Sequence, residues 1–239
     1  MLSELNRLSK GLKNTILHPQ WIANRYHAIS RRKLGELRSC EILDIGSGDS
    51  DHTMLLHSSN NTICLDYPIT NQRYTNAPDI YGDACALPVA DESVDVVLLL
   101  EVLEHIGDDS KAINSVKNAL KRGGQLYLSL PFMYPIHDAP YDYKRFTIYG
   151  IRHILKENGF KISTETIHGN SLVTIMQLMN LSLMEIIRDV GKKNILTGLV
   201  ALVLLYPICL LLNIIAWPLL YLRWNSAFCL GYFVIAERS

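Results

Sequence analysis

The chain has 239 residues, which is enough for one α/β domain with a sizeable core and some further elements. Lysine plus arginine equals aspartate plus glutamate, at 23 each, so the charge gives no reason to expect nucleic-acid binding. Five cysteines at irregular spacing, without a CxxC pair, exclude a disulfide framework and a cysteine-based zinc site. They indicate reduced thiols in a cytosolic setting, and we expect no metal site.

The first 38 residues form a polar, periodic region of their own. Leucines recur there at helical spacing, and Pro19 is expected to divide the region into two helices. The region lacks a long apolar core and a small-residue cleavage site, so it is not expected to be a secretory signal.

From residue 39 to residue 168, strand patterns alternate with helix patterns, which predicts a doubly wound sheet. The run 93–100 is continuously apolar, as is typical of a central parallel strand covered on both faces. The expected strands are 41–45, 61–66, a short one within 79–83, 93–100, 125–131, 160–167 and, after an apolar segment, 227–238. The expected helices are 49–58, 108–122 and 147–159.

A glycine turn follows the first of these strands. Gly46 and Gly48 let the backbone turn and approach a ligand closely at the carboxyl edge of the sheet, where open α/β sheets bind ligands. The third glycine of a dinucleotide fingerprint is replaced by Asp51, whose charge would repel a pyrophosphate. The turn therefore favours a ligand without phosphates, and its carboxylate suits one with positive charge.

Four acids occupy matching places at strand ends: Asp44, Asp66, Asp83 and Glu101. Any one of them could be a helix N-cap or a solvated loop acid. Together they predict one crevice, in which Asp66 is placed to accept hydrogen bonds from two ribose hydroxyls.

These motifs resemble the class I S-adenosylmethionine-dependent methyltransferases, of the type 11-like group. The resemblance is carried by "LDIGSGDS" (43–50), "LDYP" (65–68), "GDACALPVADESVDVVLLLEVLEHI" (82–106) and "LKRGGQLYLSLPF" (120–132). It implies a Rossmann-like, doubly wound, seven-stranded sheet, mostly parallel with an antiparallel last strand, to which this chain adds a hydrophobic helical insertion.

The resemblance also implies roles for the residues of the crevice. Asp44, Gly46 and Gly48 would cradle the methionine part of S-adenosylmethionine. Many members carry a third glycine where this chain has Ser50, and we expect a tighter turn there.

The other acids would hold the rest of the cofactor. Asp66 would bind the ribose, and Asp83 with the backbone of Ala84 would read the adenine. Glu101 would lie near the sulfonium.

The segment 131–147 follows the fifth strand and combines aromatic residues with polar ones, as loops that carry function often do. We expect His137 to be the general base for an acceptor hydroxyl, or at least to contact the acceptor, with His105 as a second candidate. Asp142, Tyr143 and Arg145 would bind and orient the acceptor. The alternative is that Asp142 and Arg145 pair to brace the loop.

The same segment contains the pattern H-x-x-P-x-D-Y-x-R-F-T, which resembles methyltransferases of bacterial cell-surface glycan and lipid-linked sugar pathways. That likeness implies a hydroxyl on a sugar or glycolipid as the acceptor.

Residues 195–222 contain no charged side chain. As one helix they would be about 42 Å long, against a hydrocarbon core of about 30 Å. Because the last strand must return to the sheet, both ends are expected on one side of a membrane. Lys192, Lys193 and Arg223 flank the segment as the cytoplasmic side would require.

Pro207, Asn213 and Pro218 offer break points, which predicts a re-entrant helical hairpin or helices lying in the interface. Three aromatic residues are expected at headgroup level: Trp217, Tyr221 and Trp224. Residues 172–190 form a second apolar helix beside this segment. The alternatives are a dimerisation interface, which leaves a homo-oligomer open, and a helical cap over the site.

These observations predict N-terminal helices (1–38), a methyltransferase core (39–168), a membrane-associating insertion (169–224) and a last core strand (225–239). The expected activity is methyl transfer from S-adenosylmethionine to an oxygen of a sugar or lipid-linked glycan at the cytoplasmic membrane face. The alternatives are a quinone or other small-lipid acceptor, and a membrane-bound scaffold without turnover. A nicotinamide-dependent dehydrogenase is disfavoured by the carboxylate at position 51.

Overall fold

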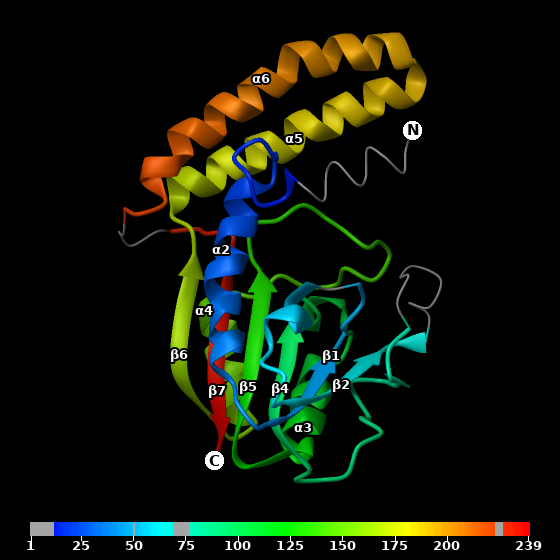
Figure 1. Ribbon diagram of the computed structural model, residues 1–239, viewed down its shortest axis with the longest axis vertical. Helices are drawn as coiled ribbons and strands as arrows, with labels where there is room; N and C mark the ends of the chain where they lie inside the picture. Colours follow the sequence, from blue (N-terminus) through cyan, green and yellow to red (C-terminus); the bar gives the residue numbers. More distant parts are fainter. Residues whose placement is uncertain (1–11, 50, 69–76, 223–226) are drawn as a thin grey trace. The chain divides into compact units, whose positions relative to one another are not determined.

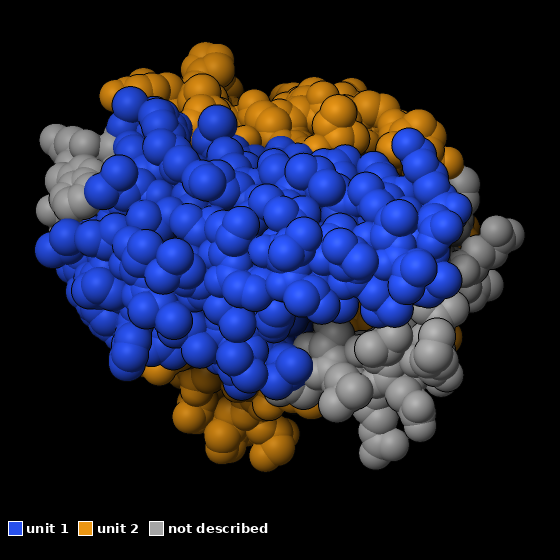
Figure 2. All heavy atoms as spheres, turned by 90° about the horizontal axis from the view of Figure 1, so that it is seen from above, with its two compact units in different colours: residues 1–29, 133–135, 167–230 blue, residues 30–132, 136–166, 231–239 orange. Residues whose placement is uncertain are grey.

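The computed structural model describes residues 12–49, 51–68, 77–222 and 227–239. The chain divides into two compact units, coloured separately in Figure 2. One comprises residues 30–132, 136–166 and 231–239, and the other comprises residues 1–29, 133–135 and 167–230. The unit coloured orange in Figure 2 holds nearly all of the sheet, and the blue unit holds the long helices. The domain boundaries expected at residues 38, 168 and 224 stay predictions.

The sheet has seven strands in the order β3-β2-β1-β4-β5-β7-β6 (Figure 1). Its pairs are parallel from β3 through β5, and β7 runs antiparallel to β5. The predicted mostly parallel, Rossmann-like sheet with an antiparallel last strand is therefore confirmed. The strands are β1 (Glu41–Ile45), β2 (Asn61–Asp66), β3 (Ile80–Tyr81), β4 (Val94–Leu100), β5 (Leu120–Pro131), β6 (Phe160–His168) and β7 (Gly231–Arg238).

The register of the central strands brings their carboxyl ends level. Ile45 of β1 lies opposite Leu65 of β2 and Leu99 of β4. The residues that follow these three positions therefore lie along one edge of the sheet, which is where parallel sheets bind ligands.

One face of the sheet is covered by the short helix η1 (Arg32–Glu36) and the residue after it. Leu34 and Leu37 pack there against Ile42, Leu98 and Phe233 in a buried apolar cluster. The helices α3 (Asp109–Ala119) and α4 (Ile148–Glu157) begin at residues whose side chains cap them. The caps are Asp108, which accepts from the Lys111 amide, and Thr147, which accepts from the Gly150 amide.

Several predicted boundaries were wrong. The helix expected over 49–58 is only a 3₁₀ helix, η2 (Asp51–Leu55). The helix expected to reach residue 122 ends at Ala119, because Leu120 already pairs with Val94 in the sheet. The last strand begins at Gly231 and not at residue 227. In the N-terminal region, α2 (Trp21–Arg31) begins two residues after Pro19, and residues 1–11 lie outside the described part.

The other unit is built around a helical hairpin of α5 (Ser171–Lys193) and α6 (Ile195–Leu219), which lie side by side in Figure 1. Only Asn194 separates them, and its side chain accepts hydrogen bonds from the first amides of α6. The predicted breaks in the apolar segment were wrong: α6 is a single helix that contains Pro207 and Pro218.

Buried amide side chains tie this hairpin to the N-terminal segment. Asn213, expected as a break point, is fully buried and donates to the carbonyls of Ile16 and His18. It also accepts a 2.9 Å hydrogen bond from Asn180 of α5. Gln177 of α5 accepts from the Ala23 amide in the same way. Because a buried amide needs partners, these bonds fix which faces of the helices meet.

Candidate active site

A cavity of about 360 Å³ opens at the carboxyl edge of the sheet, within the unit that contains the sheet. Its volume is within the usual range for small-molecule sites. It is lined by residues that follow β1, β2, β3 and β4 and by the loop after β5. They are Ile45, Gly46, Leu65–Tyr67, Gly82–Cys85, Glu101, Val102, His105–Gly107, Asp138, Tyr141 and Tyr143.

The glycine turn after β1 is fixed by its neighbours. Gly46 has a φ of +73°, and a Cβ built there would lie 2.5 Å from Cγ2 of Val102. Only glycine fits both the backbone angle and the space. The amide of Gly48 donates to the Asp66 carboxylate at 3.0 Å, and the amide of Tyr67 donates to it at 2.7 Å. The turn and Asp66 are therefore held together as one unit.

The turn after β3 contributes Asp83 and Ala84 to the cavity wall, and their predicted contact with adenine stays a prediction. The Asp83 carboxylate accepts from the Cys85 amide at 2.8 Å, which holds the turn closed. The preceding Gly82 has no room for a side chain, because a Cβ there would lie 2.8 Å from Cδ of Pro88.

Two non-glycine residues of the cavity wall have left-handed backbone conformations. Glu101 has a φ of +58° and Asp138 has a φ of +50°. Such conformations cost free energy and cluster at functional sites. One carboxylate oxygen of Glu101 is buried and, within the described part of the chain, has no hydrogen-bond partner. The fold therefore holds a carboxylate at the end of β4 whose oxygen is left for a ligand.

The charged groups of the cavity wall are of one sign. Asp66, Asp83, Glu101 and Asp138 line it, whereas the described lining residues include no lysine or arginine. A phosphate would be repelled by these carboxylates, and a cation would be attracted. The cavity is therefore suited to a positively charged ligand without phosphates.

Asp44 differs from the other three predicted acids. It is almost fully buried, is not among the lining residues, and binds Nε2 of the equally buried His52 at 2.9 Å. Asp44 is therefore paired with His52 in this structure, and its predicted contact with the methionine part stays a prediction. Ser50 lies outside the described residues.

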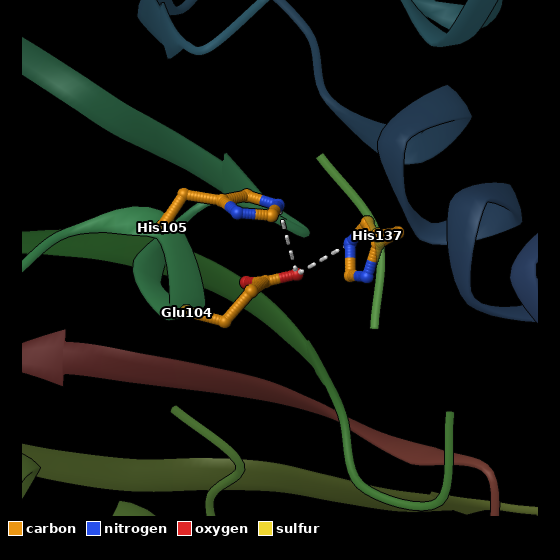
Figure 3. A group of neighbouring side chains, drawn as sticks. All are labelled: Glu104, His105 and His137. Carbon is orange, nitrogen blue, oxygen red and sulfur yellow. Dashed lines mark ion pairs between the residues drawn. The ribbon is translucent and has the colours of Figure 1, made fainter. Parts of the chain in front are cut away.

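Beside the cavity, Glu104, His105 and His137 point toward one another (Figure 3). Glu104 and His105 belong to the short helix η4 (Leu103–His105), and His137 belongs to the loop after β5. Oε1 of Glu104 lies 3.8 Å from Nε2 of His105 and 3.9 Å from Nε2 of His137. The two histidine rings meet edge to face, with 4.8 Å between their centroids.

The surroundings shift the acid–base properties of this group. Burial, and then the negative charge of Glu101, raises the pKa of Glu104 well above its usual 4.5. Burial also lowers the pKa of His105 below its usual 6.5. Pairs of titratable groups with pKa values moved in this way are typical of active sites.

The loop residues Asp142 and Arg145 form a bidentate ion pair, with nitrogen–oxygen distances of 2.5 and 2.6 Å. The bracing role considered for them is therefore present in the structure. Hydrogen bonds from Arg145 hold the pKa of Asp142 well below its usual 3.8. The backbone amide of His137 also donates to Asp142, so the pair fixes the loop that carries His137. Tyr143 lines the cavity and is half exposed.

Residues 43–128 match the family described as a methyltransferase domain. The match covers the strands from β1 to β5 and includes the glycine turn, Asp66, Asp83 and Glu101.

Curated proteins match this part of the chain. A "probable S-adenosylmethionine-dependent methyltransferase" of Mycobacterium tuberculosis is 26% identical over 113 residues, covering 45% of this chain and 41% of the relative. The 27-O-demethylrifamycin SV methyltransferase of Amycolatopsis mediterranei is 30% identical over 100 residues, covering 36% and 37%. This chain thus spans about two fifths of the length of the relatives it matches.

Solved structures share the fold of this chain. An S-adenosylmethionine-dependent methyltransferase from Mesorhizobium loti is 15% identical, with a TM-score of 0.55, covering 92% of this chain and 98% of that one. The [4+2]-cyclase SpnF is also 15% identical, with a TM-score of 0.54, covering 90% and 80%. Because a cyclase shares this fold, the activity has to be argued from the site.

Proposed function

We propose that this chain transfers a methyl group from S-adenosylmethionine to a hydroxyl oxygen of an acceptor. The observation that supports this most directly is the cavity wall, whose charged residues are carboxylates alone. S-Adenosylmethionine carries a cationic sulfonium and no phosphate, so it matches that wall. The name of the Mycobacterium tuberculosis relative supports the same cofactor.

In this proposal the cofactor lies along the carboxyl edge of the sheet. Asp66, oriented by the Gly48 and Tyr67 amides, accepts from the ribose hydroxyls. Asp83 and the backbone of Ala84 bind the adenine. The methionine part lies over the turn of Gly46 and Gly48, beside Asp44, whose carboxylate binds His52.

The sulfonium would lie near Glu101. The acceptor oxygen attacks the methyl carbon in line, the carbon–sulfur bond breaks, and its electron pair returns to sulfur to give neutral S-adenosylhomocysteine. Most of the rate acceleration in such a transfer comes from holding the acceptor oxygen close to the methyl group.

A base must receive the hydroxyl proton. We propose His137 for this role, since it faces Glu104 and His105 beside the cavity. Tyr143 would contact the acceptor directly, whereas Asp142 and Arg145 would orient it by fixing the loop. Activity of a His137→Ala variant equal to that of the wild type would rule out this assignment.

The acceptor is proposed to be a sugar or lipid-linked glycan at the cytoplasmic membrane face. The structural support is α6, which has a mean hydropathy of 2.7 over its most apolar window and is mostly exposed. Its large apolar side chains face away from α5, and several are more than half exposed: Ile195, Leu196, Val203, Leu204, Leu211 and Ile214. The same exposed surface makes a quinone or other small lipid the second candidate.

We infer that the α5–α6 hairpin lies along the membrane surface and does not cross it. The end of α5 that neighbours the start of α6 carries five exposed charges: Glu185, Arg188, Asp189, Lys192 and Lys193. An upright hairpin would move these charges through the hydrocarbon core, which is costly. A hairpin in the interface leaves them in water while α6 contacts the acyl chains.

The test of the cofactor site is calorimetric titration with S-adenosylhomocysteine of the wild type and of Asp66→Asn. The variant keeps the size of the side chain and removes its charge. We expect micromolar binding by the wild type. Each charge-assisted bond contributes about 1.5–3 kcal/mol, so the variant should bind at least about tenfold more weakly.

The matched control is Asp91→Asn, which changes an exposed aspartate of the same unit and should bind like the wild type. Absence of binding by the wild type would contradict the proposal. The membrane-bound scaffold without turnover would then be the better interpretation.

A further inference from the structure

The cluster of Glu104, His105 and His137 has a feature that proton transfer alone does not require. Glu104 is fully buried, and neither of its carboxylate oxygens has a hydrogen-bond partner among the described residues. Buried carboxylates are nearly always bonded to donors or to a cation. Glu101, whose charge raises the pKa of Glu104, also has a buried oxygen without a donor among the described residues, so two carboxyl groups that lack donors lie close together here.

The two histidines present their lone pairs toward Glu104, because their other nitrogens are engaged. Nδ1 of His105 lies 3.2 Å from the carbonyl oxygen of Tyr141. Nδ1 of His137 lies 3.3 Å from the Asp142 carboxylate. Carbonyl and carboxylate oxygens only accept, so in a neutral imidazole the proton is on Nδ1 and Nε2 is the electron-pair donor.

This arrangement is how metal-binding histidines are oriented in proteins. One ring nitrogen donates to a carboxylate or backbone carbonyl, and the other binds the ion. The Asp142 carboxylate that holds His137 is itself held by Arg145, which adds a further supporting contact.

The distances suit a single ion. Two atoms that both bind zinc at about 2.1 Å are at most about 4.2 Å apart. The contacts from Glu104 to the two histidines, at 3.8 and 3.9 Å, are within this limit. All three ligand atoms lie within 4.8 Å of one another. A small rotation of the histidine rings therefore brings their two Nε2 atoms within the limit of about 4.2 Å as well.

We propose that Glu104, His105 and His137 bind a divalent transition-metal ion beside the cavity. Two imidazole nitrogens and one carboxylate oxygen are a ligand set that suits zinc, iron(II), cobalt(II) or manganese(II). Three protein ligands leave positions open for other oxygens. The sequence prediction of no metal site had considered only the cysteines.

The role of the ion rests on the proposed function. The cluster adjoins Glu101, near which the methyl group is expected, so the open positions would take oxygens of the acceptor. An acceptor with two neighbouring oxygens, such as a diol or a hydroxy acid, fits this best. With the ion bound, Nε2 of His137 is a ligand and no longer the base: the ion would lower the pKa of the acceptor hydroxyl, and its proton would pass to water.

The test uses the full-length protein in detergent, after treatment with a chelator. Cobalt(II) is titrated in while its visible spectrum is recorded, and zinc is then added to displace it. We expect one equivalent of cobalt to bind, without the charge-transfer band that cysteine thiolates produce. That band matters because Cys85 also lines the cavity.

Two variants locate the ion. Glu104→Gln keeps the side-chain volume and removes the charge, and His137→Ala removes one nitrogen ligand. Each should weaken cobalt binding at least about tenfold. The control is His153→Ala, an exposed histidine of α4, which should bind cobalt like the wild type. Circular dichroism checks that each variant is folded. Two variants are used so that the test can still be read if one of them does not fold.

Three results would overturn the proposal. They are no cobalt binding by the wild type, binding that falls less than tenfold in both folded variants, or a thiolate band. Titration of the same samples with S-adenosylhomocysteine separates the two proposals. Binding of the nucleoside without cobalt excludes only the metal site. Binding of cobalt without the nucleoside excludes the methyl-transfer proposal and leaves the metal site standing.

Discussion

Gly46 shows how a single residue prepares the cofactor site. Its φ of +73° belongs to the left-handed region, and a Cβ there would lie 2.5 Å from Cγ2 of Val102. A left-handed conformation costs a residue with a side chain about 1–2 kcal/mol, and the collision with Val102 adds to that cost. We predict that Gly46→Ala weakens S-adenosylhomocysteine binding by at least about tenfold, measured by calorimetry.

A second substitution separates the two causes. Val102→Ala removes the colliding methyl groups and leaves the backbone angle unchanged, so the double variant should recover part of the lost affinity. Gly150→Ala is the control, since a Cβ there makes only an ordinary contact with Thr147. Wild-type affinity in Gly46→Ala would show that the turn is not in contact with the cofactor.

At the residue scale, the sequence predicts the positions of residues at strand ends better than the positions of residues that depend on partners far away in the chain. Asp66, Asp83, Ala84 and Glu101 line the cavity because each lies at the carboxyl end of a parallel strand or within three residues after it. The pairing of Asp44 with His52 had no such signal, because η2 is too short to show a helical period.

Glu104 was missed for a related reason. In "EVLEHI" it reads as the second acid of a short helix, and its burial becomes visible only when the loop carrying His137 lies beside it. The signal available in the sequence for this role was a pair of acids three residues apart, followed directly by a histidine.

At the scale of elements, the α5–α6 hairpin depends on glycines at its turn. A Cβ at Gly198 would lie 2.5 Å from Cα of Gly191, so the two helix backbones nearly touch there. Alanine normally stabilises a helix relative to glycine by up to about 1 kcal/mol. We predict the opposite sign here: Gly198→Ala should lower the thermal transition of the detergent-purified protein, measured by circular dichroism.

Leu199→Ala is the control for this prediction. Leu199 follows Gly198 on α6, and its side chain is 52% exposed, so truncating it should change the transition little. If Gly198→Ala instead raises the temperature of the thermal transition, helix propensity outweighs the contact with Gly191, and the two helices do not pack this closely in solution.

The strands were predictable because their apolar pattern and their flanking turns agree, and β1 and β2 begin and end where the sequence indicated. The predictions of the helices were wrong where packing outweighed the local sequence signals. Pro207 should end a helix, yet α6 passes through it while α5 packs alongside. The carbonyl left unbonded belongs to Val203, on the exposed face of the helix.

At the scale of the whole molecule, the chain combines a carboxylate-lined cavity with a hairpin whose outer surface is apolar. The α6 surface was predicted to contact a membrane, with a dimer interface or a helical cap as alternatives. Trp217 and Tyr221, predicted at headgroup level, are more than half exposed, whereas Arg223 and Trp224 lie outside the described residues. Small and amide side chains on its inner face, Gly198, Cys209, Asn213 and Ala216, are buried. Such an inner face is common between helices in membranes.

A flotation experiment decides between these interpretations. Protein reconstituted with phosphatidylcholine vesicles should float with them, and Val203→Asp combined with Ile214→Asp should leave it in the soluble fraction. Burying each apolar side chain contributes roughly 1.5–3 kcal/mol, so replacing two by charges should reduce partitioning more than a hundredfold. Ile136→Asp, at an apolar residue of the other unit that is 82% exposed, is the control and should float. If the wild type stays soluble and sediments as a dimer that the double variant dissociates, α6 is a dimer interface.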